Sequence, residues 1–124
     1  MIPINLKSPT PLWEQIKEGL KNQILLGVWS AGEQLPSVRS LAAELGINPN
    51  TIQRAYTELE REGLTFTVSG RGCFVEENVE VLALKRKSEA LEKFTKAVDD
   101  CIKSGIEKDE LLKQIETLFG KDGN

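Results

Sequence analysis

Five side chains that can form hydrogen bonds stand close together near the middle of the chain: Asn50, Thr51, Gln53, Arg54 and Thr57. Asparagine and glutamine amides can pair with adenine, an arginine guanidinium can pair with guanine, and threonine can contact a phosphate or a thymine methyl group. Acidic residues follow only after this group, at Glu58, Glu60 and Glu62. A segment that lacks negative charge at one end only is suited to place that end against a polyanion. The alternative is a solvated surface whose polarity is incidental.

Catalytic chemistry has little support in the same sequence. The 124 residues contain no histidine, and the two cysteines, Cys73 and Cys101, lie in different segments. No glycine-rich phosphate loop joins a strand to a helix, and no recognisable motif pairs two carboxylates. We therefore expect no enzyme activity, no cofactor and no metal site, and we expect both thiols to be reduced.

Length and charge favour a small globular protein of the cytoplasm. With 40% hydrophobic and 28% charged residues, the chain has room for one small domain and an appendage. No window approaches the roughly 18 apolar residues of a membrane span, and Thr10-Pro11 interrupts the place of a signal-peptide core. The net charge of −3 is uneven, since residues 1–75 carry seven basic and seven acidic side chains and residues 76–124 carry nine and twelve. Whole-chain acidity therefore says little about what one face of the front half binds.

Two helices are predicted ahead of the polar group. In the first, Thr10 is the expected N-cap and Pro11 the first helical residue. Its apolar residues recur every four positions until Gly27. The second predicted helix is capped by Ser37 and ends at Gly46, where a left-handed backbone is expected.

The third predicted helix carries the polar group. Asn48 is a suitable N-cap and Pro49 suits the first helical position. Ile47 and Ile52 form a hydrophobic staple, and Gly63 ends the helix. The turn of about three residues before this helix is typical of a helix-turn-helix, whose second helix places its N-terminal end in the major groove of DNA. The alternative is a plain helical hairpin within a core.

A hairpin is predicted after the third helix. The period of apolar residues changes from 3.6 to 2, which predicts strands over residues 64–68 and 73–75. Residues 30–36 are expected to form an irregular connector or a short strand. Arg71 lies between two glycines at the hairpin tip, where it can approach a minor groove or a pair of phosphates; the alternative is an exposed turn residue. Together these elements predict a mainly α-helical α+β fold, with a winged helix-turn-helix over residues 1–76.

Residues 77–124 predict two further helices, separated by Gly105 and ending at Gly120. Their apolar faces are formed by Leu84, Leu91, Phe94, Val98, Ile102, Leu112, Ile115 and Phe119. Two amphipathic helices of this size cannot bury both faces against each other, so a partner is expected, most simply a second copy of the chain. The alternative is that they fold back on the front domain as additional core.

Two residues at the start of the second helix, Ser37 and Arg39, are expected to face the DNA backbone beside the groove. Ser37 has an alternative, purely structural role as a helix cap. Double-stranded DNA is thus the expected partner. The alternative function is a winged-helix assembly module that binds protein without specific DNA contacts.

The segment from about Leu12 to Val75 resembles the GntR family of bacterial winged-helix regulators, through "PLWEQI", "LPSVRSLAAELGINPNTIQRAYTELEREGL" and "SGRGCFV". The resemblance implies DNA contacts at Arg39, Asn48, Pro49, Asn50, Thr51, Gln53, Ser69 and Gly70, with Arg54 and Arg71 in places typical of the family. Many members have Ser-Arg where this chain has Asn48-Pro49, and arginine where it has Gln53. The resemblance therefore implies an operator that differs from theirs.

The short tail narrows the resemblance. About 50 residues follow Val75, too few to enclose a metabolite in a pocket of several hundred cubic ångströms within one chain. The chain is similar to the YtrA-type subgroup, in which a helical appendage serves dimerisation. This implies a homodimeric regulator, a repressor rather than an activator, that binds an inverted repeat, and members of the subgroup often control transporter operons. A small-molecule effector is possible but is not indicated.

Overall fold

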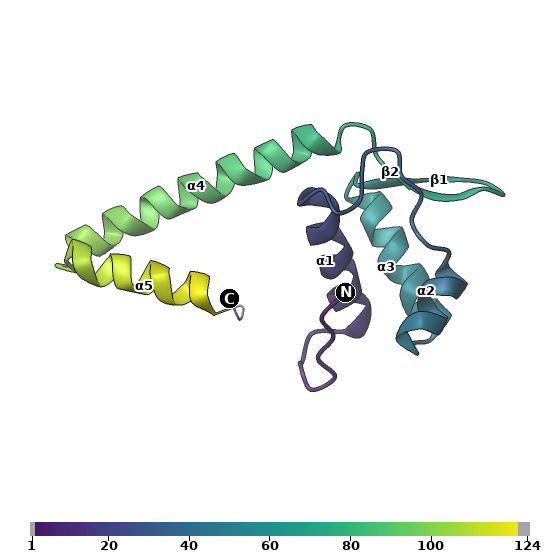
Figure 1. The fold of residues 1–124 in the computed structure, drawn as a ribbon, viewed down its shortest axis with the longest axis horizontal. Coiled ribbons are helices and arrows are strands. Elements are labelled where there is room, and N and C mark those ends of the chain that lie inside the picture. Colours follow the sequence, from purple (N-terminus) through teal and green to yellow (C-terminus); the bar gives the residue numbers. More distant parts are fainter. Residues whose placement is uncertain (1, 122–124) are drawn as a thin grey trace. The chain divides into compact units, whose positions relative to one another are not determined.

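The computed structural model describes residues 2–121, which form five helices and one two-stranded hairpin (Figure 1). The predicted fold, mainly α-helical with a small hairpin wing, is confirmed. The chain divides into two compact units, of which the first ends at Leu84 and the second starts at Lys85. The first unit includes the first turns of helix α4 (Val79–Lys103), where Val79 is buried in its core. Among the described residues, no helix combines the length and the apolar character that a membrane span needs.

Helix α1 (Leu12–Leu25) begins one residue later than predicted. Its N-cap is Pro11 rather than Thr10, because Pro11 has a non-helical ψ of 146°, and no side chain caps the helix. The Gln15 amide instead fastens the preceding segment, since its Nε2 donates to the Asn5 carbonyl at 3.0 Å and to the Thr10 carbonyl at 2.9 Å.

Helices α2 (Val38–Leu45) and α3 (Pro49–Arg61) form the predicted helix-turn-helix. Ser37 caps α2 by accepting a backbone N–H bond at 3.0 Å, and Asn48 caps α3 in the same way at 2.8 Å. Gly46 ends α2 with a φ of 67°, a conformation that strains any residue with a Cβ. These three residues fix where one helix stops and the next begins.

Apolar side chains from all three helices meet in one core. Helix α3 lies between α1 and α2, and the hairpin lies beside the end of α3 (Figure 1). The most deeply buried apolar side chains are Ile16, Leu20, Ile24, Ile52, Ala55, Leu59 and Val75. Because α3 supplies three of these, one face of α3 is held inside the unit and its opposite face is left at the surface.

Strands β1 (Thr65–Val68) and β2 (Gly72–Val75) form the wing. The connector before α2 also pairs with β2: Gln34 bridges Phe74, and the Leu35 amide donates to the Cys73 carbonyl at 2.9 Å. The short-strand form of this connector is thus confirmed. The wing is therefore supported along both edges of β2, which a lone hairpin would lack.

The inward face of β1 differs from the prediction. Leu64, Phe66 and Val68 were expected to point inward, but Thr65 is 1% exposed and Val68 is 37% exposed. Leu64 is buried yet precedes the strand, because its amide donates to the Leu59 carbonyl at the end of α3. The alternation of β1 therefore starts at Thr65, one residue later than the sequence pattern suggested.

The second unit consists of the remainder of α4 and helix α5 (Lys108–Gly120). Gly105, with a φ of 82°, ends α4, and α5 ends at the predicted Gly120. Six of the eight predicted interface residues are exposed apolar side chains: Leu84, Leu91, Phe94, Ile102, Leu112 and Phe119. Val98 and Ile115 are partly buried. These helices thus display far more apolar surface than helices of a closed domain do.

Candidate nucleic-acid interface

The outer face of α3 presents the polar side chains that the sequence singled out. Asn50, Gln53, Arg54 and Thr57 are exposed, and Thr51 is partly buried. The predicted residues outside α3 are exposed as well: Ser37, Arg39, Asn48, Ser69, Gly70 and Arg71. Pro49, the first residue of α3, is also exposed. The first turn of α3 contains no acidic residue, so its N-terminal amides and partial positive charge face outward without an internal counter-charge.

Gln53 and Thr57 are joined to each other on the helix surface. The Gln53 Nε2 donates to the Thr57 Oγ1 at 3.3 Å, and that hydroxyl donates to the Gln53 carbonyl at 2.9 Å. The longer of these two bonds is weak, so a base edge can replace it at small cost. The Gln53 amide is therefore available for contact but begins from one defined orientation.

Arg54 lies against helix α1 rather than standing free. Its guanidinium carbon is 4.2 Å from the centroid of the Trp13 ring, within the range of a cation–π contact. Sequence reasoning proposed a guanine partner for Arg54 and placed Trp13 only beside the apolar face of its helix. The contact joins residues that are far apart in sequence, so local pattern could not reveal it.

A groove with a volume of about 680 Å³ lies between α3, the start of α2 and the wing. It brings together four of the predicted contact residues, Ser37, Gln53, Thr57 and Arg71. Its floor includes Tyr56, whose hydroxyl donates to the Pro36 carbonyl at 2.6 Å. Burial raises the pKa of Tyr56, so the hydroxyl stays protonated and keeps this bond.

Two contacts that the sequence did not indicate fix the wing beside this groove. The Gln34 amide donates to the Arg71 carbonyl at 2.8 Å, and a Cβ at Gly72 would lie 2.6 Å from the Gln34 nitrogen. On the other strand, the Thr67 hydroxyl donates to the Glu60 carboxylate at 2.6 Å. The wing tip is therefore held at a set position relative to α3. Glu60 serves this purpose, which accounts for an acidic residue at the edge of the interface.

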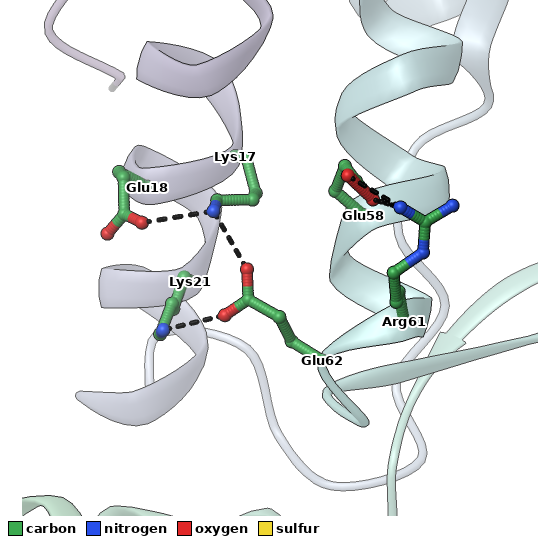
Figure 2. A network of polar contacts seen from close by, with 6 residues as sticks. All are labelled: Lys17, Glu18, Lys21, Glu58, Arg61 and Glu62. Atoms are coloured by element: carbon green, nitrogen blue, oxygen red, sulfur yellow. Dashed lines mark hydrogen bonds and ion pairs between the residues drawn. The ribbon is translucent and has the colours of Figure 1, made fainter.

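The ion pairs of the first unit separate its basic side chains into two sets. Glu62 lies between Lys17 and Lys21 at 2.8 and 2.7 Å, and Arg61 pairs with Glu58 at 2.8 Å (Figure 2). Arg39, Arg54 and Arg71 take part in none of the ion pairs found in residues 2–121. The balanced charge of this unit therefore leaves three unneutralised arginines, and all three are among the predicted contact residues.

Glu62 provides a prediction on the pH dependence of stability. Burial alone would raise the pKa of Glu62, but the bonds from Lys17 and Lys21 outweigh it and lower that pKa below its ordinary value of 4.5. The same bond raises the pKa of Lys17. A depressed carboxyl pKa stabilises the fold above the ordinary pKa, and this stability is lost as the pH falls through the folded-state pKa. We expect Glu62→Gln to cost at most about 1 kcal/mol at pH 7, since the side chain is 31% exposed, and nothing below the folded-state pKa.

Urea unfolding of wild type and Glu62→Gln across a pH series measures this difference. Glu44→Gln is the control, because Glu44 is exposed and belongs to no ion pair in residues 2–121. A Glu62→Gln deficit that keeps its full size at acidic pH would contradict the assignment.

Comparisons with known proteins agree with this geometry. The HTH-type transcriptional repressor YtrA of Bacillus subtilis is 38% identical over 119 residues, which are 95% of this chain and 92% of YtrA. The HTH-type transcriptional regulator YhcF of the same organism is 38% identical over 115 residues, 90% of this chain and 93% of YhcF. Because both similarities span nearly the whole length, they include the two C-terminal helices.

Solved structures show the same likeness. A transcriptional regulator from Oenococcus oeni has a TM-score of 0.71 at 30% identity and covers 97% of this chain and 100% of its own. The DNA-binding domain of AraR in complex with operator ORR3 has a TM-score of 0.53 at 29% identity, over 59% of this chain and 88% of that domain. The bacterial regulatory proteins of the gntR family match residues 12–75. This chain therefore belongs to the gntR family of bacterial regulatory proteins.

Proposed function

We propose that this protein is a sequence-specific DNA-binding transcriptional regulator that places the N-terminal half of α3 in the major groove. The observation that carries the proposal is the separation of charges in the first unit. Lys17, Lys21 and Arg61 are neutralised by carboxylates, whereas the unpaired arginines accompany the exposed polar face of α3. Such a surface attracts phosphates although the unit as a whole carries no net charge.

The contact residues have different roles in this proposal. Asn50, Thr51 and Gln53 face base edges, where amide and hydroxyl groups distinguish one base pair from another. Asn48 and Pro49 shape the end of α3 that approaches the groove, with Thr57 behind Gln53. The remaining contacts position the protein on the backbone or in the adjacent minor groove, and they are made by Ser37, Arg39, Arg54, Ser69, Gly70 and Arg71.

We infer that the protein acts as a homodimer through the exposed apolar faces of α4 and α5. A second copy is the simplest partner for these faces, and a two-fold axis would present two α3 helices to successive major grooves about 34 Å apart. The operator is then an inverted repeat. Repression follows in the cytoplasm when the dimer occupies a promoter, and no chemistry on the DNA is needed. The similarity to a named repressor over nearly its full length supports this direction of regulation.

Selection of bound duplexes from a random pool tests the proposal. We expect enrichment of a two-fold symmetric site, which we call the selected duplex, with half-sites one helical turn apart. Binding to the selected duplex should weaken steeply as salt rises, with a slope of about −0.9 for each phosphate contact. A pool that remains random, with equal affinity for all duplexes, would contradict the proposal and favour a protein assembly module.

A further inference from the structure

Trp13 provides a platform for one arginine of the proposed interface. The Arg54 guanidinium carbon lies 4.2 Å from the centroid of the Trp13 ring, and Arg54 is exposed while Trp13 is partly buried. An exposed arginine samples many rotamers, and a cation over an aromatic face is restricted to a few of them. The partly buried indole is held by its own helix, so α1 determines where the charge of Arg54 is presented.

The same ring is approached by a second cation that is already neutralised. Lys17 Nζ lies 5.9 Å from the centroid of the Trp13 ring and pairs with Glu18 at 3.3 Å and Glu62 at 2.8 Å. Within residues 2–121, Arg54 is part of no ion pair. The nearby carboxylates are thus engaged by lysines, and the guanidinium keeps its charge and the N–H groups that do not face the ring for an external anion.

We propose that Trp13 is a positioning residue for DNA binding, which holds the Arg54 guanidinium over its indole face so that Arg54 meets a backbone phosphate beside the major groove. This inference rests on the proposed function and deepens it. A phosphate rather than a base is the partner, because the contact with Trp13 draws Arg54 toward α1, which is not the helix of the groove. Trp13 contributes by reducing the freedom that Arg54 loses on binding.

A double-mutant cycle tests the role of Trp13. Affinities for the selected duplex and for a random duplex are measured for wild type, Trp13→Leu, Trp13→Phe, Arg54→Ala and the Trp13→Leu/Arg54→Ala pair. We expect Trp13→Leu to weaken binding to both duplexes by about three- to tenfold, and Trp13→Phe, which keeps an aromatic face, by less than about twofold. In the Arg54→Ala background, Trp13→Leu should cost nothing further. Arg54→Ala should also lower the salt slope by about 0.9 for each subunit.

A merely structural role for Trp13 gives a different pattern. The control is Trp13→Leu combined with Arg71→Ala, whose losses should multiply because Arg71 lies on the wing. If Trp13→Leu costs the same factor with and without Arg54, the positioning role is overturned and the proposed function stands. If the losses appear only on the selected duplex, Arg54 reads a base and the phosphate assignment is overturned. If wild type binds neither duplex, both the proposed function and this inference fail.

A fluorescence measurement reports on the contact directly. The chain has two tryptophans, so Trp29→Phe leaves Trp13 as the only one. In that background, the emission of Trp13 should change when Arg54 is replaced by alanine and when the selected duplex is added. The duplex should leave the emission unchanged once Arg54 is absent. Emission that ignores both changes would overturn the inference.

Discussion

Replacing Arg39, Arg54 and Arg71 together by glutamine is expected to weaken binding of the selected duplex by at least about 100-fold at about 0.1 M salt. Each phosphate contact contributes about 0.9 to the slope of log K against log salt, so three lost contacts correspond to about 2.7 decades between 1 M and 0.1 M salt. All three arginines are exposed and belong to no ion pair in the described part of the chain, so each loses its full charge toward DNA.

The matched control removes the same charge from different places. Replacing Lys17, Lys21 and Arg61 by glutamine also lowers the net charge by three, but these side chains already pair with carboxylates. Since charges more than about 8 Å from the DNA are screened at physiological salt, we expect a loss of no more than about threefold. Titration at several salt concentrations measures both variants. Equal losses would show that total charge, and not the three unpaired arginines, governs binding.

Introducing Leu91→Glu together with Phe94→Glu is expected to convert the protein to monomers and to weaken operator binding by about 10²- to 10⁴-fold. Leu91 is 66% exposed and Phe94 is 50% exposed on α4, so both can carry a charge without disturbing their own unit. In a dimer interface, two carboxylates from each chain would be buried without partners. Loss of the dimer removes the gain in effective concentration that links the two half-sites.

Sedimentation and binding assays separate this effect from unfolding. Thr95→Glu adds the same charge at an exposed polar position of α4 and should leave the dimer intact. The double variant should keep its helical circular dichroism and its affinity for an isolated half-site. Val98 is a less suitable position, because its partial burial means that a charge there would disturb the chain itself. A double variant that remains a folded dimer would rule out this face as the main interface.

Local chemistry was sufficient to predict the helix-turn-helix. Ser37 and Asn48 can cap helices only at their N-termini, and Gly46 tolerates the left-handed backbone that ends α2. These residues act within one turn of their own position. The sequence pattern therefore placed the outer face of α3, and with it Asn50 and Gln53, where the structure has them.

Contacts between elements could not be predicted in the same way. The pairing of Lys17 with Glu62 and the contact of Trp13 with Arg54 depend on how α1 packs against α3, and periodicity does not specify that packing. The inward face of β1 was misassigned for a related reason. The end of α3 uses the backbone of Leu64, which shifts the alternation of the strand by one residue.

Amide chemical shifts followed during titration with the selected duplex test most directly whether α3 enters the major groove. We predict the largest changes at residues 48–54 and at the wing tip, residues 69–71, with little change at Glu62. Large changes confined to α4 and α5, with residues 48–54 unaffected, would contradict the account.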